Sequence, residues 1–481
     1  MYLGIDLGTT NLKVILLDEK LVVIAQTSAP LSVSRPAPLW SEQNPSDWWV
    51  ALNNAMKQLS DQFPQALKKV KAIGLSGQQH GAVLLDEKNN VLRPAILWND
   101  GRAHAECQDI MNACPTAIHL AGSIIMPGFT APKLLWVKKH EPAIFAKTKK
   151  ILLPKDYLRL MMTHDFATDM SDASGTGWLA IQKRTWSDEL LSVCSLTQQH
   201  MPTLFEGNAI TGKITADIAK QWGMSEGVCV VGGAGDNAAS AVSMGSVNPH
   251  TAYLSLGTSA TFFIACEQFQ PNPSAAIHTF CHALPHYWHH MAVHLNGAST
   301  LTWLTNLFSK DISALLSSSA QSNRNLIFLP YLSGERTPYN NPHASGVFFG
   351  LTHSTTQADI AMAVLEGTAF GIALGYEAIK QDASLTIKEI SAVGGGSKND
   401  AWGIILASAL QYPLTCRKVR DVGAAFGAAK LAWLSDFPNE KISEPEIEKI
   451  LQPDARLISQ YEKKFTLFKK LYSSTQSLMT T

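Results

Sequence analysis

The sequence predicts an α/β protein built from two large domains of related architecture. Strand-like segments alternate with helical segments along the chain, which is typical of this fold class. A strand, a Gly-Thr turn and a second strand occur twice and far apart, which indicates a duplicated architecture. With 481 residues, 46% of them hydrophobic, the chain is also too long for one ordinary core.

Two hairpins define the predicted organisation. The first covers residues 2–18 around the turn Gly8-Thr9-Thr10. The second covers residues 251–265 around the turn Gly257-Thr258-Ser259. We expect one such hairpin to open each half of the chain.

A domain boundary is predicted just before the second hairpin. Residues 243–250 contain Gly, Asn and Pro, which interrupt the preceding helical pattern. The predicted domains are therefore residues 1–245 and 246–481.

Further elements are expected between and after the hairpins. Strands are predicted at residues 72–75 and 228–231, and a helix at residues 45–59 with Ser46 placed to cap its first turn. An amphipathic tail from Ser459 onward predicts a closing helix.

A glycine-containing helix is predicted over residues 360–376. Apolar and small side chains recur every four residues on one stripe, and Gly367, Gly371 and Gly375 recur on another. Each glycine costs ~1 kcal/mol of helix propensity relative to alanine, so the pattern predicts close backbone packing in a core and no chemistry.

Composition favours a small-molecule partner. The 39 basic and 39 acidic residues cancel, which gives no electrostatic signature for nucleic acid or an anionic membrane surface. The seven cysteines form no Cys-x-x-Cys pair, and Asp6 interrupts the place where a signal peptide would be apolar. We expect a cytoplasmic protein.

Three turns have the composition of phosphate sites. In the first, Gly8, Thr9 and Thr10 offer backbone N–H groups and hydroxyls to an anion. The carboxylate of Asp6 would be repelled by phosphate unless a cation lay between them, which makes Asp6 a candidate ligand of Mg²⁺. One such turn alone is more often an ordinary hairpin. Together with Gly257-Thr258-Ser259 and Gly394-Gly395-Gly396, it favours ATP.

A glycine-rich loop presents the candidate catalytic carboxylate. Gly232-Gly233-Ala234-Gly235-Asp236-Asn237 follows a predicted strand and precedes an Ala-rich helix. The loop lets a substrate approach the backbone, so we interpret Asp236 as the catalytic base. An isolated Asp at this position is by default a helix cap, and both roles are compatible.

Two polar segments suit a polyol. Ser76-Gly77-Gln78-Gln79-His80-Gly81 ends a predicted strand and offers hydrogen-bond donors and acceptors. Trp98-Asn99-Asp100-Gly101-Arg102 adds an aromatic face among polar groups, although a single Trp is more often a core residue.

Two other patterns are set aside. Gly207-x-x-x-x-Gly212-Lys213 resembles a nucleotide-binding loop, but Ile214 lacks the hydroxyl that would contact Mg²⁺, and we interpret it as a surface turn. The histidines at 282, 286, 289 and 290 with Cys281 match no zinc spacing.

Several segments resemble the FGGY family of carbohydrate kinases. They are Asp6 to Thr10 with Lys13, residues 128–137, residues 346–351 and residues 363–366. The resemblance runs from Tyr2 to about residue 433 and implies two ribonuclease H-like domains, as in actin and Hsp70 ATPases, with the active site in the cleft between them. It also implies an ATP- and Mg²⁺-dependent kinase that forms a homodimer.

Four segments are similar to the members of this family that act on D-xylulose: residues 40–45, 77–81, 98–102 and 331–338. This similarity implies phosphorylation of D-xylulose to D-xylulose 5-phosphate in xylose catabolism. It also implies roles for single residues. Asp236 would accept the proton, and the sugar would contact Gln79, His80, Asn237, Trp98 and Asp100. The nucleotide would lie among Gly8, Thr9, Thr10, Lys13, Gly257, Thr258, Gly395, Gly396 and Asn399.

Two alternatives stay open at this point. The same turns would serve a kinase for another polyol, such as L-ribulose, L-xylulose, glycerol or gluconate. An actin- or Hsp70-like ATPase that acts on a protein partner is a more remote alternative.

Overall fold

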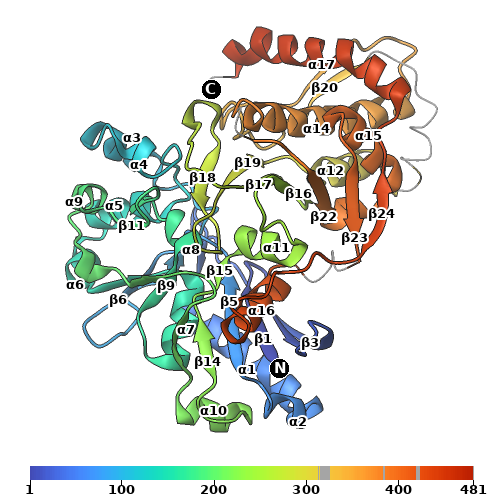
Figure 1. The fold of residues 1–481 in the computed structure, drawn as a ribbon. Coiled ribbons are helices and arrows are strands. Elements are labelled where there is room, and N and C mark those ends of the chain that lie inside the picture. The colour runs from blue at the N-terminus through green and yellow to red at the C-terminus, as the bar shows by residue number, and fades with distance from the viewer. Residues whose placement is uncertain (312–313, 315–325, 383–384, 419–422, 480–481) are drawn as a thin grey trace.

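The structure is a computed structural model that describes residues 1–481 except 312–313, 315–325, 383–384, 419–422 and 480–481. Two mixed sheets, each in its own half of the chain, carry the architecture (Figure 1). In edge-to-edge order the N-terminal sheet consists of β13 (Ile210–Lys213), β14 (Cys229–Val231), β5 (Ala72–Gly77), β1 (Tyr2–Leu7), β2 (Asn11–Leu17) and β3 (Val23–Pro30), with β15 (Ala234–Gly235) also paired to β5. The C-terminal sheet consists of β18 (His278–Cys281), β19 (Trp288–His294), β17 (Ala260–Cys266), β16 (Thr251–Leu256), β22 (Glu389–Val393), β23 (Leu414–Arg417) and β24 (Ile447–Leu451).

The two sheets share one topology, which confirms the predicted duplication. Each begins with an antiparallel hairpin, β1 with β2 and β16 with β17. A third strand pairs antiparallel to the second strand of the hairpin. On the other side, β5 and β14 run parallel to β1, and β22 and β23 run parallel to β16. This is the arrangement of ribonuclease H-like domains, as the family resemblance implied.

Helices α11 (Asp236–Met244) and α16 (Gly423–Asp436) lie between the two sheets (Figure 1). Although α16 comes late in the sequence, its alanines pack on the N-terminal sheet in one apolar cluster with Tyr2 and Ala72. Helix α11 contacts the other sheet through Ala241 and Met244, which pack with Tyr253. The start of α11 is therefore held at the junction of the two halves.

Close backbone contact fixes this junction. A Cβ added to Gly427 of α16 would lie 1.8 Å from the carbonyl oxygen of Ala239 in α11. A Cβ added to Gly74 of β5 would lie 1.8 Å from the carbonyl oxygen of Ala428. Only glycine permits these approaches, so the sequence itself sets the distance between α16, α11 and the sheet.

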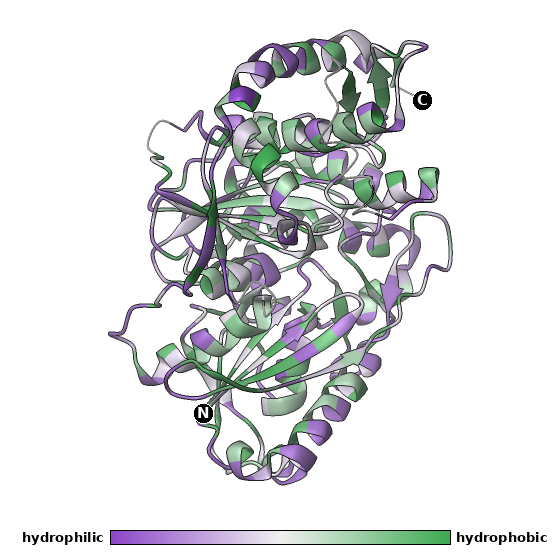
Figure 2. Ribbon diagram, turned by 90° about the vertical axis from the view of Figure 1, so that its right-hand side faces the viewer, coloured by the Kyte–Doolittle hydropathy of each residue, from purple (hydrophilic) through white to green (hydrophobic). Residues whose placement is uncertain are grey.

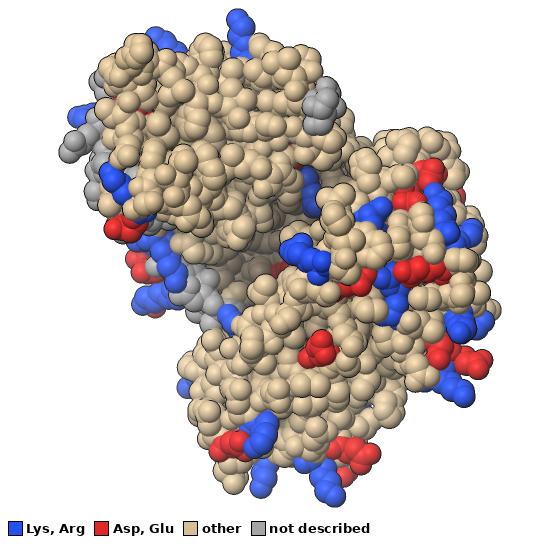
Figure 3. Space-filling model, turned by 180° about the vertical axis from the view of Figure 1, so that it is seen from behind, with Lys and Arg blue, Asp and Glu red and all other residues tan. Residues whose placement is uncertain are grey.

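The long segment between β5 and β13 forms a separate lobe on the N-terminal half. Its core contains Leu134 and Trp178, together with Phe280 from β18 of the C-terminal half. The helices of the segment are α3 (His104–Ala113), α4 (Ala117–Leu120), α5 (Thr130–His140), α6 (Pro142–Lys147), α7 (Pro154–Thr163), α8 (Met170–Ser174) and α9 (Asp188–Val193), and its short strands are β6 (Val83–Leu85), β7 (Ala95–Ile96), β8 (Lys150–Leu152), β9 (Ala167–Asp169), β10 (Leu179–Ala180), β11 (Thr185–Trp186) and β12 (Thr203–Phe205). Helix α7 differs from the others, because it packs in the core of the N-terminal sheet. The lobe therefore forms one wall of the cleft between the two halves. Figure 3 shows the surface deeply hollowed there.

The remaining helices cover the sheets. They are α1 (Pro45–Gln62), α2 (Pro64–Leu67), α10 (Ala216–Trp222), α12 (Ser299–Phe308), α14 (Gln357–Ile379), α15 (Asp400–Leu410) and α17 (Ala455–Thr475). Strand β4 (Glu42–Gln43) pairs with β7, and β20 (Ile327–Leu329) pairs with β21 (Val347–Phe349). Figure 2 shows hydrophobic residues in inner strands, and many hydrophilic residues on outer strands, outer helices and loops.

Helix α14 is the predicted glycine-containing helix. By length and composition it could cross a membrane, but 83% of its most apolar window is buried inside the protein. A Cβ added to Gly367 would lie 2.2 Å from the carbonyl oxygen of Phe328, and one added to Gly375 would lie 2.4 Å from the ring of His294. At Gly371 the nearest atom is 3.5 Å away. The close packing predicted from these glycines is confirmed at two of the three positions.

Two local predictions were wrong. The cap of α1 is Asn44, whose side chain accepts the Ser46 N–H at 3.4 Å, because the helix begins at Pro45. The supposed surface turn at Gly207 is buried, with its N–H donating to the Ala283 carbonyl at 3.0 Å, and the chain continues into edge strand β13.

Candidate active site

Two carboxylates from distant parts of the sequence share one site. Asp6 lies near the end of β1, and Asp236 is the first residue of α11. Burial, and then the negative charge of Asp6, raise the pKa of Asp236 to about 7. Burial raises the pKa of Asp6 to about 6, while Ser76 and Lys13 act in the opposite direction. Shifts of this size in a cleft are typical of functional carboxylates.

Asp236 is oriented by its own helix. The Asn237 N–H and side-chain amide donate to Asp236 Oδ1 at 2.7 and 2.9 Å. The Tyr253 hydroxyl of β16 donates to the Asn237 carbonyl at 2.9 Å, which connects this turn to the C-terminal sheet. The Asn237 side chain was predicted to bind the sugar. In the structure its amide already donates a hydrogen bond to Asp236, so contact with a sugar would require this bond to be shared or exchanged.

Asp6 has an oxygen available for a cation. Its Oδ1 is buried and has no hydrogen-bond partner, which is the condition a hard cation would relieve. Lys13 faces Asp6 across the β1–β2 hairpin. The described part of the chain contains no cluster of three or more His, Cys, Asp or Glu residues with metal-site geometry. A cation held at Asp6 would therefore depend on other oxygen donors, such as phosphate and water.

The first predicted phosphate turn is held by a network of side chains. Thr9 Oγ1 donates to Gln78 Oε1 at 3.0 Å and accepts from Trp98 Nε1 at 3.0 Å. The Gln43 amide donates to the Thr9 carbonyl at 2.7 Å. The Thr9 hydroxyl is thus already bonded within the protein, and the exposed Thr10 lies beside it in the same turn.

The second turn and the glycine cluster lie side by side, because β16 and β22 are parallel neighbours. A Cβ added to Gly394, whose φ is +91°, would lie 2.7 Å from the carbonyl oxygen of Leu256, just before Gly257. Thr258 and Gly395 are exposed, and a Cβ at Gly395 would meet no atom within 4 Å. Asn399 caps α15 by accepting the Trp402 N–H at 2.9 Å. The fold therefore brings the predicted nucleotide residues of this half together.

Gln79 and His80 follow the end of β5. A Cβ added to Gly235 would lie 2.5 Å from Gln79 Nε2, which places Gln79 directly beside the catalytic turn. The His80 ring stacks on Phe129 with centroids 5.0 Å apart. Burial lowers the pKa of His80 to about 3, so the ring is neutral near pH 7.

The tautomer of His80 follows from its neighbour. Its Nδ1 lies 2.6 Å from the carbonyl oxygen of Gly175, which is only an acceptor, so Nδ1 carries the proton. Nε2 then has a free lone pair and can accept a hydrogen bond from a hydroxyl.

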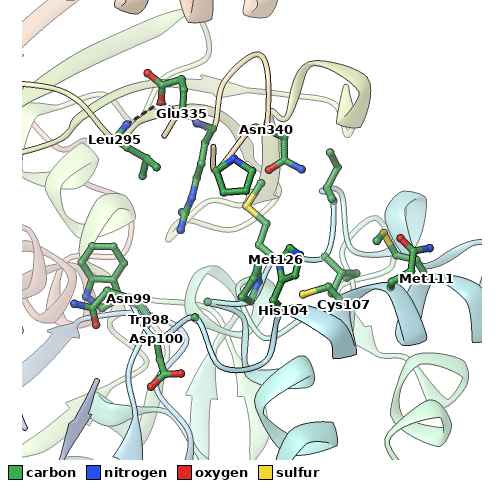
Figure 4. A pocket seen from close by; sticks show the side chains of 18 residues that line it. Trp98, Asn99, Asp100, His104, Cys107, Met111, Met126, Leu295, Glu335 and Asn340 are labelled. Atoms are coloured by element: carbon green, nitrogen blue, oxygen red, sulfur yellow. Dashed lines mark hydrogen bonds between the residues drawn. The ribbon is translucent and has the colours of Figure 1, made fainter. Parts of the chain in front are cut away.

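Trp98 and Asp100 line a cavity of about 380 Å³ between the N-terminal lobe and the C-terminal half (Figure 4). Figure 4 shows the Asp100 carboxylate turned away from the cavity. It accepts the Ser41 N–H at 2.6 Å and pairs with Arg102 at 2.7 Å. A direct sugar contact by Asp100 would require these bonds to rearrange.

Sequence reasoning missed a buried ionic network behind the catalytic loop. Lys155 Nζ contacts Asp156, Asp169 and Asp172 at 2.6, 2.8 and 3.2 Å, and these side chains are 0% exposed. Asp169 accepts the Ser171 hydroxyl, which in turn accepts the Gly235 N–H at 3.2 Å. The network therefore supports the residue before Asp236. No spacing in the sequence predicts this network, because its residues come together only in the folded protein.

Of the histidines that were set aside as metal ligands, His289 and His290 lie in β19, and His282 and His286 lie in the turn between β18 and β19. His289 stacks on Phe263 with centroids 4.2 Å apart, and His282 Nε2 lies 3.2 Å from the Ser246 carbonyl oxygen. Burial lowers the pKa of both, so each is a neutral core residue.

Comparison with known proteins gives matches along nearly the whole chain. Residues 1–243 match the N-terminal domain, and residues 252–435 the C-terminal domain, of the FGGY family of carbohydrate kinases. The chain is 48% identical over 487 residues to the xylulose kinase of Escherichia coli (strain K12) and 46% identical over 490 residues to that of Klebsiella pneumoniae, covering 100% of both chains in each case.

Solved structures agree. The xyloylose kinase of Brucella ovis is 43% identical with a TM-score of 0.96 and covers 99% of both chains. The ligand-bound xylulose kinase of Lactobacillus acidophilus is 25% identical with a TM-score of 0.93 and covers 98% of both chains. The gluconate kinase of the same organism has the same identity and TM-score, so the backbone alone does not distinguish acceptor sugars.

Proposed function

Because this chain belongs to the FGGY family of carbohydrate kinases, we propose that it transfers the γ-phosphoryl group of ATP to D-xylulose, giving D-xylulose 5-phosphate and ADP. The choice of D-xylulose as the substrate rests on sequence identity along the entire chain with relatives that are named xylulose kinases. The first of them is 48% identical. The reaction supplies the phosphorylated ketose of xylose catabolism.

The site supports a direct, in-line transfer. The O5 hydroxyl of the sugar attacks the γ-phosphorus, the bond from that phosphorus to the β,γ-bridging oxygen breaks, and ADP leaves. Asp236 takes the proton of the attacking hydroxyl. A pKa of about 7 suits this role, since a base titrating near the working pH is both largely ionised and basic.

The other residues bind and orient. Gln79 and His80 would hydrogen-bond the sugar, with His80 Nε2 as an acceptor. The turns at Gly8 to Thr10 and at Gly257 to Thr258, with Gly395 and Gly396, would surround the nucleotide. Asp6 would hold Mg²⁺, which would supply positive charge to the phosphate oxygens.

Closure of the two halves would exclude water. Asp236 is the first residue of α11, which packs against both halves, so movement of one half relative to the other would act on the helix that carries the catalytic carboxylate. A water molecule in the sugar site would otherwise receive the phosphoryl group and make the enzyme an ATPase.

The test is ADP formation with D-xylulose, L-xylulose, L-ribulose, D-ribulose, glycerol and gluconate, each with and without Mg²⁺. We expect the highest kcat/KM with D-xylulose and dependence on Mg²⁺. A higher kcat/KM with another polyol would make that polyol the substrate, and the reaction class would stay the same. Turnover that no sugar stimulates would favour the ATPase alternative, which the two kinase domains matched along residues 1–243 and 252–435 disfavour. The homodimer and the cytoplasmic location stay predictions.

A further inference from the structure

Arg336 presents an unpaired guanidinium to the cavity between the halves. It lines the cavity of about 380 Å³ together with Trp98 and Gly128. Its backbone N–H donates to Glu335 Oε1 at 2.8 Å, but its side chain makes no hydrogen bond or ion pair with any residue that the structure describes. Glu335 is engaged elsewhere, since Oε1 also accepts the Leu295 N–H at 2.9 Å. Burial lowers the pKa of Arg336, and the negative charge of Glu335 offsets this effect only in part.

The guanidinium reaches from the C-terminal half to the predicted sugar residues of the N-terminal half. A Cβ added to Gly128 would lie 3.9 Å from Arg336 Nη2 and 2.4 Å from the Trp98 carbonyl oxygen. The positive charge of Arg336 also contributes to lowering the pKa of His278, after burial, and that of His80, after burial and the charge of Lys133. Gly128 precedes Phe129, the ring on which His80 stacks, so the Arg336 guanidinium and His80 lie on either side of the segment Gly128-Phe129.

The chain and its packing connect the candidate sugar-binding groups of the N-terminal half. Asp236 follows Gly235, against which Gln79 packs, and His80 follows Gln79 in the chain. Arg336 comes next, from the opposite half. An acceptor with its terminal hydroxyl at Asp236 would run past Gln79 and His80 and end at Arg336.

We propose that Arg336 binds the oxygen atoms at the end of the sugar opposite to the phosphorylated hydroxyl, which in a 2-ketose are the C2 carbonyl and the C1 hydroxyl. The inference rests on the proposed function and adds a specificity residue to it. Guanidinium carries five donors and no acceptor, so it matches a carbonyl oxygen, which only accepts. A sugar that fails to pair with this cation leaves it desolvated and unbonded, which discriminates against that sugar.

The test is steady-state kinetics of Arg336→Ala and Arg336→Lys. For Arg336→Ala we expect the KM for D-xylulose to rise about tenfold to hundredfold, the range for loss of hydrogen bonds from a charged group, while the KM for ATP stays within about twofold. Arg336→Lys keeps the positive charge but lacks the planar guanidinium, so its KM for D-xylulose should lie between those of the wild type and of Arg336→Ala. Free guanidinium ions added to Arg336→Ala should lower the KM for D-xylulose, which a merely structural role of Arg336 would not allow.

The matched control is Arg456→Ala, which removes an exposed arginine of the same half and should change neither KM. Thermal unfolding of each variant checks that it is folded. If Arg336→Ala does not fold, Arg336→Lys is used for the test. An unchanged KM for D-xylulose in both Arg336 variants, with an active wild-type enzyme, would overturn the inference and leave the proposed function intact. A wild-type enzyme that does not phosphorylate D-xylulose would instead overturn the proposed function.

Discussion

Asp236 and Asp6 approach each other closely enough for the charge of Asp6, added to burial, to raise the pKa of Asp236 to about 7. One carboxylate comes from the first strand of the N-terminal sheet and the other from the helix that joins the two halves. Their proximity combines a base that titrates near neutrality with a site for a cation. Each role can be tested separately.

Replacing Asp236 by Ala removes the proposed base. We expect kcat to fall by about 10² to 10⁴, the usual contribution of general base catalysis, with little change in ATP affinity. Coupled ADP detection and a nucleotide-binding titration measure the two effects. Asp61→Ala, which removes an exposed carboxylate of α1, serves as the control. Near-normal turnover in Asp236→Ala would remove Asp236 from the mechanism.

The raised pKa of Asp236 also predicts a pH-dependent stability difference in metal-free protein. In the unfolded chain the pKa returns to about 3.9, so folding favours the protonated form. The stability contribution of Asp236 is then fully present below about pH 4 and is lost as pH rises through about 7.

Asp236→Asn cannot ionise, so it should unfold at a higher temperature than wild type at pH 8 and show a smaller gain at pH 5. Calorimetry at the two values measures this, with Asp61→Asn as the control. An equal gain at both values would mean that the carboxylate is not destabilised by its surroundings.

Replacing His80 should weaken the use of the sugar and leave the use of the nucleotide unchanged. Asn tolerates the left-handed conformation of this residue, whose φ is +68°, so His80→Asn removes the imidazole without backbone strain. We expect the KM for D-xylulose to rise about threefold to tenfold, as for loss of a neutral hydrogen bond, with an unchanged KM for ATP.

The control is His164→Asn, which changes an exposed histidine with a φ of +65°. A rise in the KM for ATP equal to the rise for sugar would argue against the assigned position of His80.

Lys155 should be essential for stability. Replacing it by Met leaves three buried aspartates without their shared cation, which costs about 3–5 kcal/mol when a buried pair is broken. Lys57→Met breaks an exposed pair with Asp61, whose side chains are 74% and 62% exposed, and should cost about 1 kcal/mol or less. Urea unfolding compares them, and a smaller loss for Lys155→Met than for Lys57→Met would contradict the buried network.

Two glycines of α14 should respond in opposite directions to alanine. At Gly371 there is room, so Ala should stabilise the helix by up to about 1 kcal/mol. At Gly367 the new methyl would meet the Phe328 carbonyl oxygen at 2.2 Å, and the required shift should cost roughly 1–3 kcal/mol. Thermal unfolding of the pair measures both. Similar effects at the two positions would show that α14 is not held at this distance from β20.

The sequence by itself determined the two hairpins, the α/β class and the helix that follows the glycine-rich loop, because alternation, Gly-Thr turns and such a loop are local signals. It also pointed to Gln79 and His80, which follow directly on a predicted strand. Tertiary structure decided what depends on contacts between distant segments. The packing of α16 on the N-terminal sheet, the ionic network around Lys155 and the position of the Arg336 guanidinium against Gly128 each join residues that no sequence period relates. The engagement of Asp100 and Asn237 within the protein was decided in the same way, since a side chain's hydrogen-bond partners are set by the fold around it.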